Sequence, residues 1–134
     1  MATTQIFLNL PIDDQKTTKA FWTALGYSYN ADFSDDHALA LEIGPGINAM
    51  LLSKARFAEF ATRPTSDGSS TEVILALGVE SRDEVDRVAD AALANGGGKA
   101  TDPQDHGFMY GRSFIDPDGH HWEVVWMDLS GGQD

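Results

Sequence analysis

The sequence has no cysteine among its 134 residues, which excludes disulfides, a thiolate nucleophile and any metal site built on cysteine. It also has no apolar run long enough to cross a bilayer and no basic segment followed by an apolar one at its start. We therefore expect no signal peptide, a cytoplasmic location and no membrane partner. Basic residues are scarce too: Lys and Arg number 9 against 21 Asp and Glu, for a formal net charge of −12. This excess of negative charge repels phosphate backbones, so nucleic acid is not an expected partner.

The most informative stretch runs through residues 108–126 and is typical of a β-hairpin. Residues 108–115 and 122–126 are rich in aromatic and β-branched side chains, and Asp116-Pro-Asp-Gly119 between them has the pattern of a type I turn. Strand alternation places the large apolar side chains on one face and the polar ones on the other. The apolar set is Trp122, Val124 and Trp126, and the opposite set is His121, Glu123 and Val125. The second face is therefore the candidate functional face.

The remaining chain divides into two halves with the same order of elements. In the first half, we expect strands at residues 5–10, 27–33, 38–43 and 47–53, a helix from Asp13 or Asp14 to Leu25, and a short helix at 55–61. In the second half, we expect a strand at 72–79, a helix opened by the capping box Ser81-Arg-Asp-Glu84, a short strand near 99–101, a loop through His106 and the hairpin. The polar segment 64–70 links the halves. We thus expect one domain over 1–134, with a first βαβββ module at 1–63, a linker at 64–70 and a second βαβββ module at 71–129.

The two halves also align residue by residue. Leu8-Asn-Leu-Pro-Ile-Asp13 lies over Leu75-Ala-Leu-Gly-Val-Glu80 at a shift of about 67 residues, which is half of the chain. Near the end of each half, Gly44-Pro-Gly46 lies over Asp116-Pro-Asp118. The shared element order and the repeated turn indicate a duplicated module.

These motifs resemble the vicinal oxygen chelate superfamily, which includes glyoxalase I, bleomycin-resistance proteins and extradiol dioxygenases. The resemblance rests on Asn9-Leu-Pro-Ile12, Phe21-Trp-x-x-Leu-Gly26, the Asp116-Pro-Asp-Gly-His120 turn and Trp122-Glu-Val124. The stretch 106–114 is similar to a bacterial subgroup usually labelled predicted lactoylglutathione lyase. The resemblance implies an α+β fold in which two βαβββ modules form a cupped sheet around a small-molecule site.

In the metal enzymes of this superfamily, four side chains hold one divalent ion, and the resemblance carries these positions onto the present chain. They fall on Phe7, on Ile74, on Glu123 and on one of Ala49, Met50 or Leu51. Apolar side chains cannot bind a hard or borderline divalent cation, so we expect no metal cofactor. A shifted site built from Glu72, His121 and Glu123 remains the alternative.

The candidate site residues are those expected on or near the candidate functional face. Glu123 is the candidate catalytic base, and its alternative role is structural, with Arg112 as its ion-pair partner. The candidate substrate-binding residues are Arg112, Tyr110, His106, His121, Phe7, Asn9, Met50 and Ile74. We expect Arg112 near the cup, where it would bind an anionic group of the ligand. That position needs a bulge at Gly111, because without one Tyr110 and Arg112 face the helices.

Three functions follow. The first is a small-molecule-binding protein or enzyme that needs no metal, the second is a metal-dependent lyase acting on a glutathione adduct, and the third is a binder that sequesters a toxic compound. A homodimer is also expected, because members of this superfamily commonly build their cups at module contacts, within or between chains. The first strand of each module would otherwise leave an unpaired sheet edge, and pairing of these strands within one chain or across two chains would equally remove it. Light scattering tests this expectation, and a monomer mass at micromolar concentration would contradict it.

Overall fold

The computed structural model describes residues 1–130, so the last four residues of the expected 1–134 domain lie outside the described part. The fold is mixed α+β with two sheets, which confirms the predicted fold class. Two compact units are present, one at Met1–Asp67 and one from Gly68 onward, and the boundary lies in the predicted linker. Within residues 1–130, no helix combines the length and the hydropathy needed to cross a bilayer.

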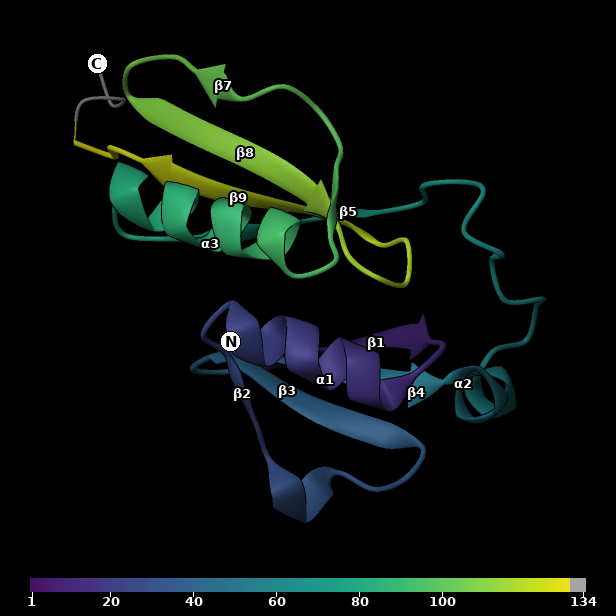
Figure 1. Cartoon of the computed structure of the whole chain (residues 1–134). Coiled ribbons are helices and arrows are strands. Elements are labelled where there is room, and N and C mark those ends of the chain that lie inside the picture. Colours follow the sequence, from purple (N-terminus) through teal and green to yellow (C-terminus); the bar gives the residue numbers. More distant parts are fainter. Residues whose placement is uncertain (131–134) are drawn as a thin grey trace. The chain divides into compact units, whose positions relative to one another are not determined.

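The first unit is a four-stranded sheet with a helix on one face (Figure 1). Its elements are β1 (Ile6–Ile12), α1 (Gln15–Ala24), β2 (Ser28–Tyr29), the 3-10 helix η1 (Ala31–Phe33), β3 (Ala38–Gly44), β4 (Ile47–Ser53) and α2 (Lys54–Phe60). The strand order is β1-β4-β3-β2, and β1 runs parallel to β4 while the other pairs are antiparallel.

Helix α1 forms because its apolar side chains recur at helical spacing and Asp14 caps its first turn. The Asp14 carboxylate accepts hydrogen bonds from the Lys16 amide and the Thr17 hydroxyl. Phe21 and Trp22 on the inner side of the helix are fully buried. Burial of such large side chains stabilises the fold by about 1.5–3 kcal/mol each, so this contact dominates the first core.

The second unit repeats the first with a second helix-covered sheet. Its elements are β5 (Ile74–Gly78), α3 (Arg82–Ala94), β6 (Gly98–Lys99), β7 (Gln104–Asp105), β8 (Met109–Ile115) and β9 (His121–Met127). The strand order is β5-β9-β8-β6, with β7 also paired to β8. Ser81 caps α3 as predicted, since its hydroxyl accepts from the Glu84 amide at 3.1 Å.

Two local predictions are wrong, and one short strand was not predicted. Pro11 lies inside β1 and does not end it, which is allowed because β1 is an edge strand that needs no donor on its free side. The strand expected at 27–33 is only two residues long and passes into η1, because the Asn30 side chain accepts from the Asp32 amide and starts a turn. Strand β7 was not predicted, since two polar residues carry no periodicity.

The hairpin turn between β8 and β9 is organised by a buried carboxylate. Asp116 accepts from the amides of Asp118 and His120 and, through its second oxygen, from the indole nitrogen of Trp122 at 2.9 Å. Burial raises the pKa of Asp116, and the nearby His120 and these hydrogen bonds lower it in part. The turn is thereby tied to the core residue that follows it.

Replacing Asp116 by Asn keeps the size of the side chain but supplies only one acceptor oxygen. Either the indole of Trp122 or the turn amides then face an NH2 group, so a buried donor loses its partner. We expect a loss of about 1–3 kcal/mol in the free energy of unfolding, measured by urea denaturation. Asp36→Asn, on an exposed residue, is the matched control and is expected to change stability little. Equal stabilities of the two variants would contradict the role of the turn.

Candidate functional site

Each sheet has one face covered by its helix and one face opposite to it, here called the open face. The pairing registers of the first sheet assign Phe7, Asn9, Asn48, Met50, Ala40 and Glu42 to the open face. Ala49 and Leu51 point the other way and are fully buried under α1. This settles the register that the sequence left open: of Ala49, Met50 and Leu51, only Met50 lies on the open face.

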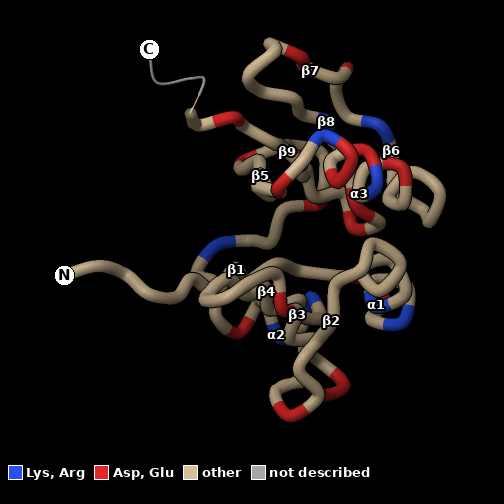
Figure 2. Tube along the Cα trace, turned by 90° about the vertical axis from the view of Figure 1, so that its left-hand side faces the viewer, with Lys and Arg blue, Asp and Glu red and all other residues tan. Residues whose placement is uncertain are grey.

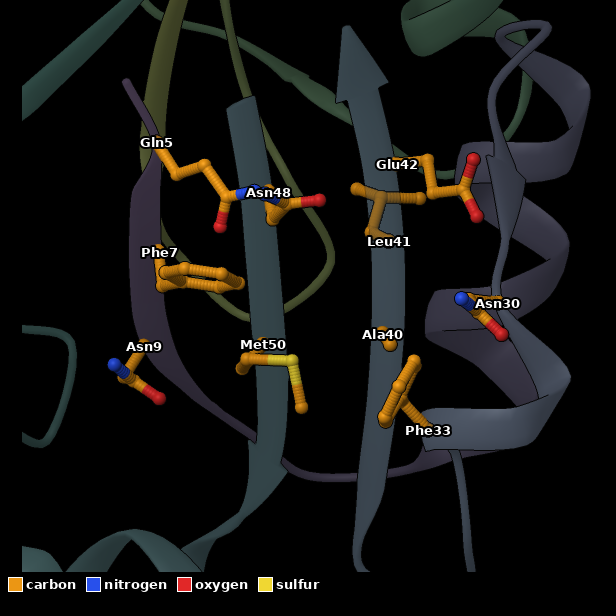
Figure 3. Close-up of a pocket in the computed structure, with 10 residues that line it drawn as sticks. All are labelled: Gln5, Phe7, Asn9, Asn30, Phe33, Ala40, Leu41, Glu42, Asn48 and Met50. Carbon is orange, nitrogen blue, oxygen red and sulfur yellow. The ribbon is translucent and has the colours of Figure 1, made fainter. Parts of the chain in front are cut away.

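The open-face side chains of the first sheet form two rows across the strands. Phe7 pairs with Asn48, which pairs with Glu42, and this is the first row. Asn9 pairs with Met50, which pairs with Ala40, and this is the second row. Figure 3 shows Phe7 and Glu42 on opposite sides, with Asn48 between them.

A pocket of about 660 Å³ lies over these rows. Its lining adds Gln5, Asn30, Phe33 and Leu41 to the six residues above. Three carboxamides in it, those of Gln5, Asn9 and Asn48, make no hydrogen bond to any residue of the described chain. The Asn30 side chain is engaged by the Asp32 amide. The pocket thus combines apolar surface with donors and acceptors that no other described residue uses.

The open face of the second sheet carries the corresponding rows with different side chains. In the first of these rows, His121 lies between Ile74 and Ile115. The His121 Nε2 atom is buried and has no hydrogen-bond partner in the described chain, which follows from these two apolar neighbours. In the second row, Glu123 lies between Ala76 and Ser113, and its carboxylate makes no ion pair or hydrogen bond with a described residue.

Arg112 and Tyr110 lie on the helix-covered face, which corrects the expected position of Arg112 near the cup. Strands β8 and β9 pair without a register shift, so no bulge at Gly111 turns Arg112 around. Its guanidinium donates to Asp86 at 3.0 Å and to Asp90 at 2.8 Å, both on α3. The Tyr110 hydroxyl donates to Asp86 at 2.6 Å, and this bond lowers the pKa of Asp86. Arg112 is therefore not the ion-pair partner of Glu123.

The loop that carries His106 is held by Arg82. The guanidinium of Arg82 donates to both carboxylate oxygens of Asp105, at 2.9 and 3.0 Å, and to the carbonyl of Gly107 at 2.8 Å. These bonds and the Gly107 amide lower the pKa of Asp105 to about 2. The same guanidinium lies 5.2 Å from the ring centroids of both Tyr110 and Trp126. His106 itself is exposed, with its Nε2 3.4 Å from the Gln104 side-chain oxygen.

The predicted site residues are thus divided among three places. Phe7, Asn9 and Met50 share the first open face, and Ile74, His121 and Glu123 share the second. Tyr110, Arg112 and the His106 loop belong to the network around α3.

A family model matches residues 4–124 of the chain and is described as the glyoxalase/bleomycin resistance protein/dioxygenase superfamily. The chain belongs to this superfamily. No curated protein matches it. Solved structures do, and the fold they share agrees with the two βαβββ modules described above.

A hypothetical protein from S. aureus is 26% identical with a TM-score of 0.78, covering 94% of this chain and 94% of its own. A glyoxalase/bleomycin resistance protein/dioxygenase family enzyme from Burkholderia phytofirmans is 16% identical with a TM-score of 0.74, covering 90% and 96%. A bleomycin resistance determinant encoded on the transposon Tn5 is 19% identical with a TM-score of 0.63, covering 93% and 98%. At these identities the last two matches carry the fold alone.

The residues of this superfamily member do not fit the divalent metal that the family resemblance implies. Asn9 and Ala76 correspond in the duplication, and their strand partners are Met50 and Glu123. The four ligand positions that the resemblance implies are then Phe7, Met50, Ile74 and Glu123, of which only Glu123 offers an oxygen donor. Over residues 1–130, no three His, Asp or Glu side chains are gathered for a metal ion, so Glu72 does not join His121 and Glu123.

Asn48, Glu42 and Gln5 were not among the predicted site residues, although strand alternation already placed Gln5 on the face of Phe7. Gln5 and Asn48 follow from alternation, because they lie two residues from Phe7 and Met50 on the same strands. Glu42 follows from the hairpin register at the Gly44-Pro-Gly46 turn, but a bulge between Glu42 and Gly44 hides that register from the sequence.

Arg82→Ala is expected to release the loop at His106. The variant loses the bonds to Asp105 and Gly107, so amide exchange at Gly107 should accelerate and the pKa of Asp105 should return toward about 3.9. In the native protein the lowered pKa adds stability that is present above about pH 4 and is lost as the pH falls toward about 2.

Hydrogen exchange and NMR titration of the Asp105 carboxyl measure both effects. Arg87→Ala is the control, because it removes another guanidinium of α3, one that pairs with Glu84 on the same helix. An unchanged Asp105 pKa in Arg82→Ala would contradict the assignment.

Proposed function

We propose that the chain binds a small organic ligand on the open face of its first sheet, without a metal ion held by the protein. The observation that carries this proposal is the pocket in which Phe7 and Met50 lie beside three unpartnered carboxamides. Small-molecule sites combine apolar surface with a few placed polar groups in about 300–1,000 Å³, and this pocket has both features.

The lack of suitable metal-ligating atoms at three of the four implied ligand positions supports the metal-independent part of the proposal. Phe7 and Ile74 have no donor atom, and the thioether of Met50 is a soft ligand unsuited to Mg²⁺, Mn²⁺ or Zn²⁺. Removal of metal by a chelator is therefore expected to leave ligand binding unchanged, and purified protein should contain far less than one equivalent of these metals. Stoichiometric metal that disappears in Glu123→Ala would contradict this.

Binding is tested with phenylbutanol, an uncharged probe whose ring suits the apolar lining. Titration should shift the side-chain carboxamide signals of Asn48 and Asn9 in NMR spectra. Met50→Lys places a long charged side chain in the middle of the second row and should weaken binding more than tenfold. Met127→Lys makes the same change on an exposed residue of the second sheet and serves as the control. Binding that survives Met50→Lys would overturn the proposed site.

Catalysis by Glu123 is the second candidate function. It is favoured by a carboxylate that no described residue pairs with, beside His121 on an open face. As a general base, Glu123 would remove an acidic C–H proton of a bound substrate. Glu123→Gln keeps the shape and removes the base, so turnover of the glutathione–methylglyoxal adduct should be abolished while binding persists.

The outcomes of that assay separate the remaining functions. Turnover that requires added Ni²⁺ or Zn²⁺ would instead support the metal-dependent lactoylglutathione lyase-like function. Binding of probes with no turnover would support a binder that sequesters a compound.

We also propose that the chain forms a homodimer and that it is located in the cytoplasm. Strands β1 and β5 each stand at the edge of their sheet, with β4 and β9 as their single strand neighbours in the described sheets. Such edges favour pairing with another strand. The location rests on the lack of cysteine, which suits a reducing compartment.

A further inference from the structure

We infer that the pocket of the first sheet takes an organic cation, with an apolar or aromatic group against Phe7 and a positively charged group against Glu42. This inference rests on the proposed function and names the class of ligand for the same site. It reverses the expectation of an anionic ligand, which depended on Arg112.

The first row sets the geometry of such a ligand. Phe7, Asn48 and Glu42 are successive cross-strand partners on β1, β4 and β3. Neighbouring strands lie about 4.8 Å apart, so Phe7 and Glu42 are separated by roughly 10 Å at the backbone. A ligand that spans this row meets a ring at one end, a carboxamide in the middle and a carboxylate at the other end.

The Phe7 end of the row offers exposed aromatic surface. The side chain is 54% exposed although it lies within a strand, and Phe33, which also lines the pocket, is 71% exposed. Exposed phenyl groups gain free energy when an apolar group covers them, and their faces also attract cations. Figure 3 shows the ring of Phe7 directed over the sheet toward β4.

The Glu42 end of the row offers an uncommitted charge. Its carboxylate lines the pocket and makes no ion pair or hydrogen bond with a described residue. The carboxylates on α3 differ, since Asp86 and Asp90 are both bonded to Arg112. Glu42 therefore has its full capacity to bind a cationic group.

No Lys or Arg of the described strands lies on either open face. By strand register, the cations of the sheets lie on the helix-covered faces: Lys99 pairs with Phe114 and Arg112 with Val124. The strand residues of the described open faces include the carboxylates Glu42 and Glu123 but no Lys or Arg. An anionic ligand in the pocket would meet the carboxylate of Glu42 at short range and no Lys or Arg among the residues that line it.

The long-range electrostatic field of the chain also favours a cationic ligand. The net charge is −12, and acidic residues recur along α3 (Figure 2). Such a field raises the rate at which cations associate and opposes anions, although salt screens it beyond about 8 Å at physiological ionic strength. Selectivity at equilibrium must then come from the contact with Glu42.

The test compares three probes that share one skeleton: phenylbutylamine, phenylbutanol and phenylbutyrate. Each has a phenyl ring and a polar group at opposite ends of a butyl chain, with charges of about +1, 0 and −1 near neutral pH. NMR titration is expected to give affinities in the order amine, alcohol, carboxylate, with all shifts centred on the Asn48 carboxamide. Phe7→Ala should weaken binding of both the amine and the alcohol.

Glu42→Gln removes the negative charge of the side chain and keeps its size, so it tests the contribution of that charge alone. It should weaken amine binding about twofold to fivefold, as for an exposed ion pair, and leave alcohol binding unchanged. Asp36→Asn removes the same charge from an exposed residue outside the pocket lining and should change neither. The amine-to-alcohol ratio should also fall at high salt in the native protein but not in Glu42→Gln.

The outcomes separate this inference from the proposed function. Equal affinities for the amine and the alcohol would contradict the preference for a cation, and so would an amine-to-alcohol affinity ratio that Glu42→Gln leaves unchanged. In both cases shifts at Asn48 would still support binding in the pocket. Preferential binding of phenylbutyrate would contradict the preference for a cation as well. Loss of Asn48 shifts with all three probes would overturn the binding site, and the ligand class with it.

Discussion

Each module depends on one constraint: its main helix covers only one face of the sheet, so strand alternation divides the side chains into a core set and an open set. In β9, Trp122 and Val124 are buried under α3 while Glu123 lies on the open face. This division holds only if β8 and β9 keep their register, and Asp116 fixes it by binding the turn amides and the Trp122 indole together. A bulge of one residue would exchange the positions of Arg112 and Ser113.

The same constraint explains why Arg112 serves the fold. On the helix-covered face it meets Asp86 and Asp90 on α3, and its side chain is only 18% exposed. A charge taken partly out of water is costly unless it is paired, so the mostly buried Arg112 depends on the two carboxylates. The open face of the second sheet therefore does not carry this cation.

Much of this architecture could be predicted from the sequence. The period of two, the Pro-containing turns and the Ser81 cap gave the strands, the hairpins and the helix start, because each is a local signal. The position of Arg112 could not be predicted, because a glycine such as Gly111 permits a bulge without requiring one. Glu42 was missed for a related reason, since a register shift lies between it and Gly44. Contacts between distant segments, such as Arg82 with Asp105, leave no periodic trace.

The two modules share a backbone arrangement but differ in the side chains on their open faces. Equivalent rows hold Phe7, Asn48 and Glu42 in the first sheet but Ile74, His121 and Ile115 in the second. The first row leaves a carboxamide and a carboxylate open to a ligand, whereas the second encloses an imidazole nitrogen between two apolar side chains. The pairing within these two rows is the same, so it does not by itself account for this difference. In the proposed function, ligand chemistry is carried by a few open-face substitutions on a repeated scaffold, and one fold can in this way support unrelated activities.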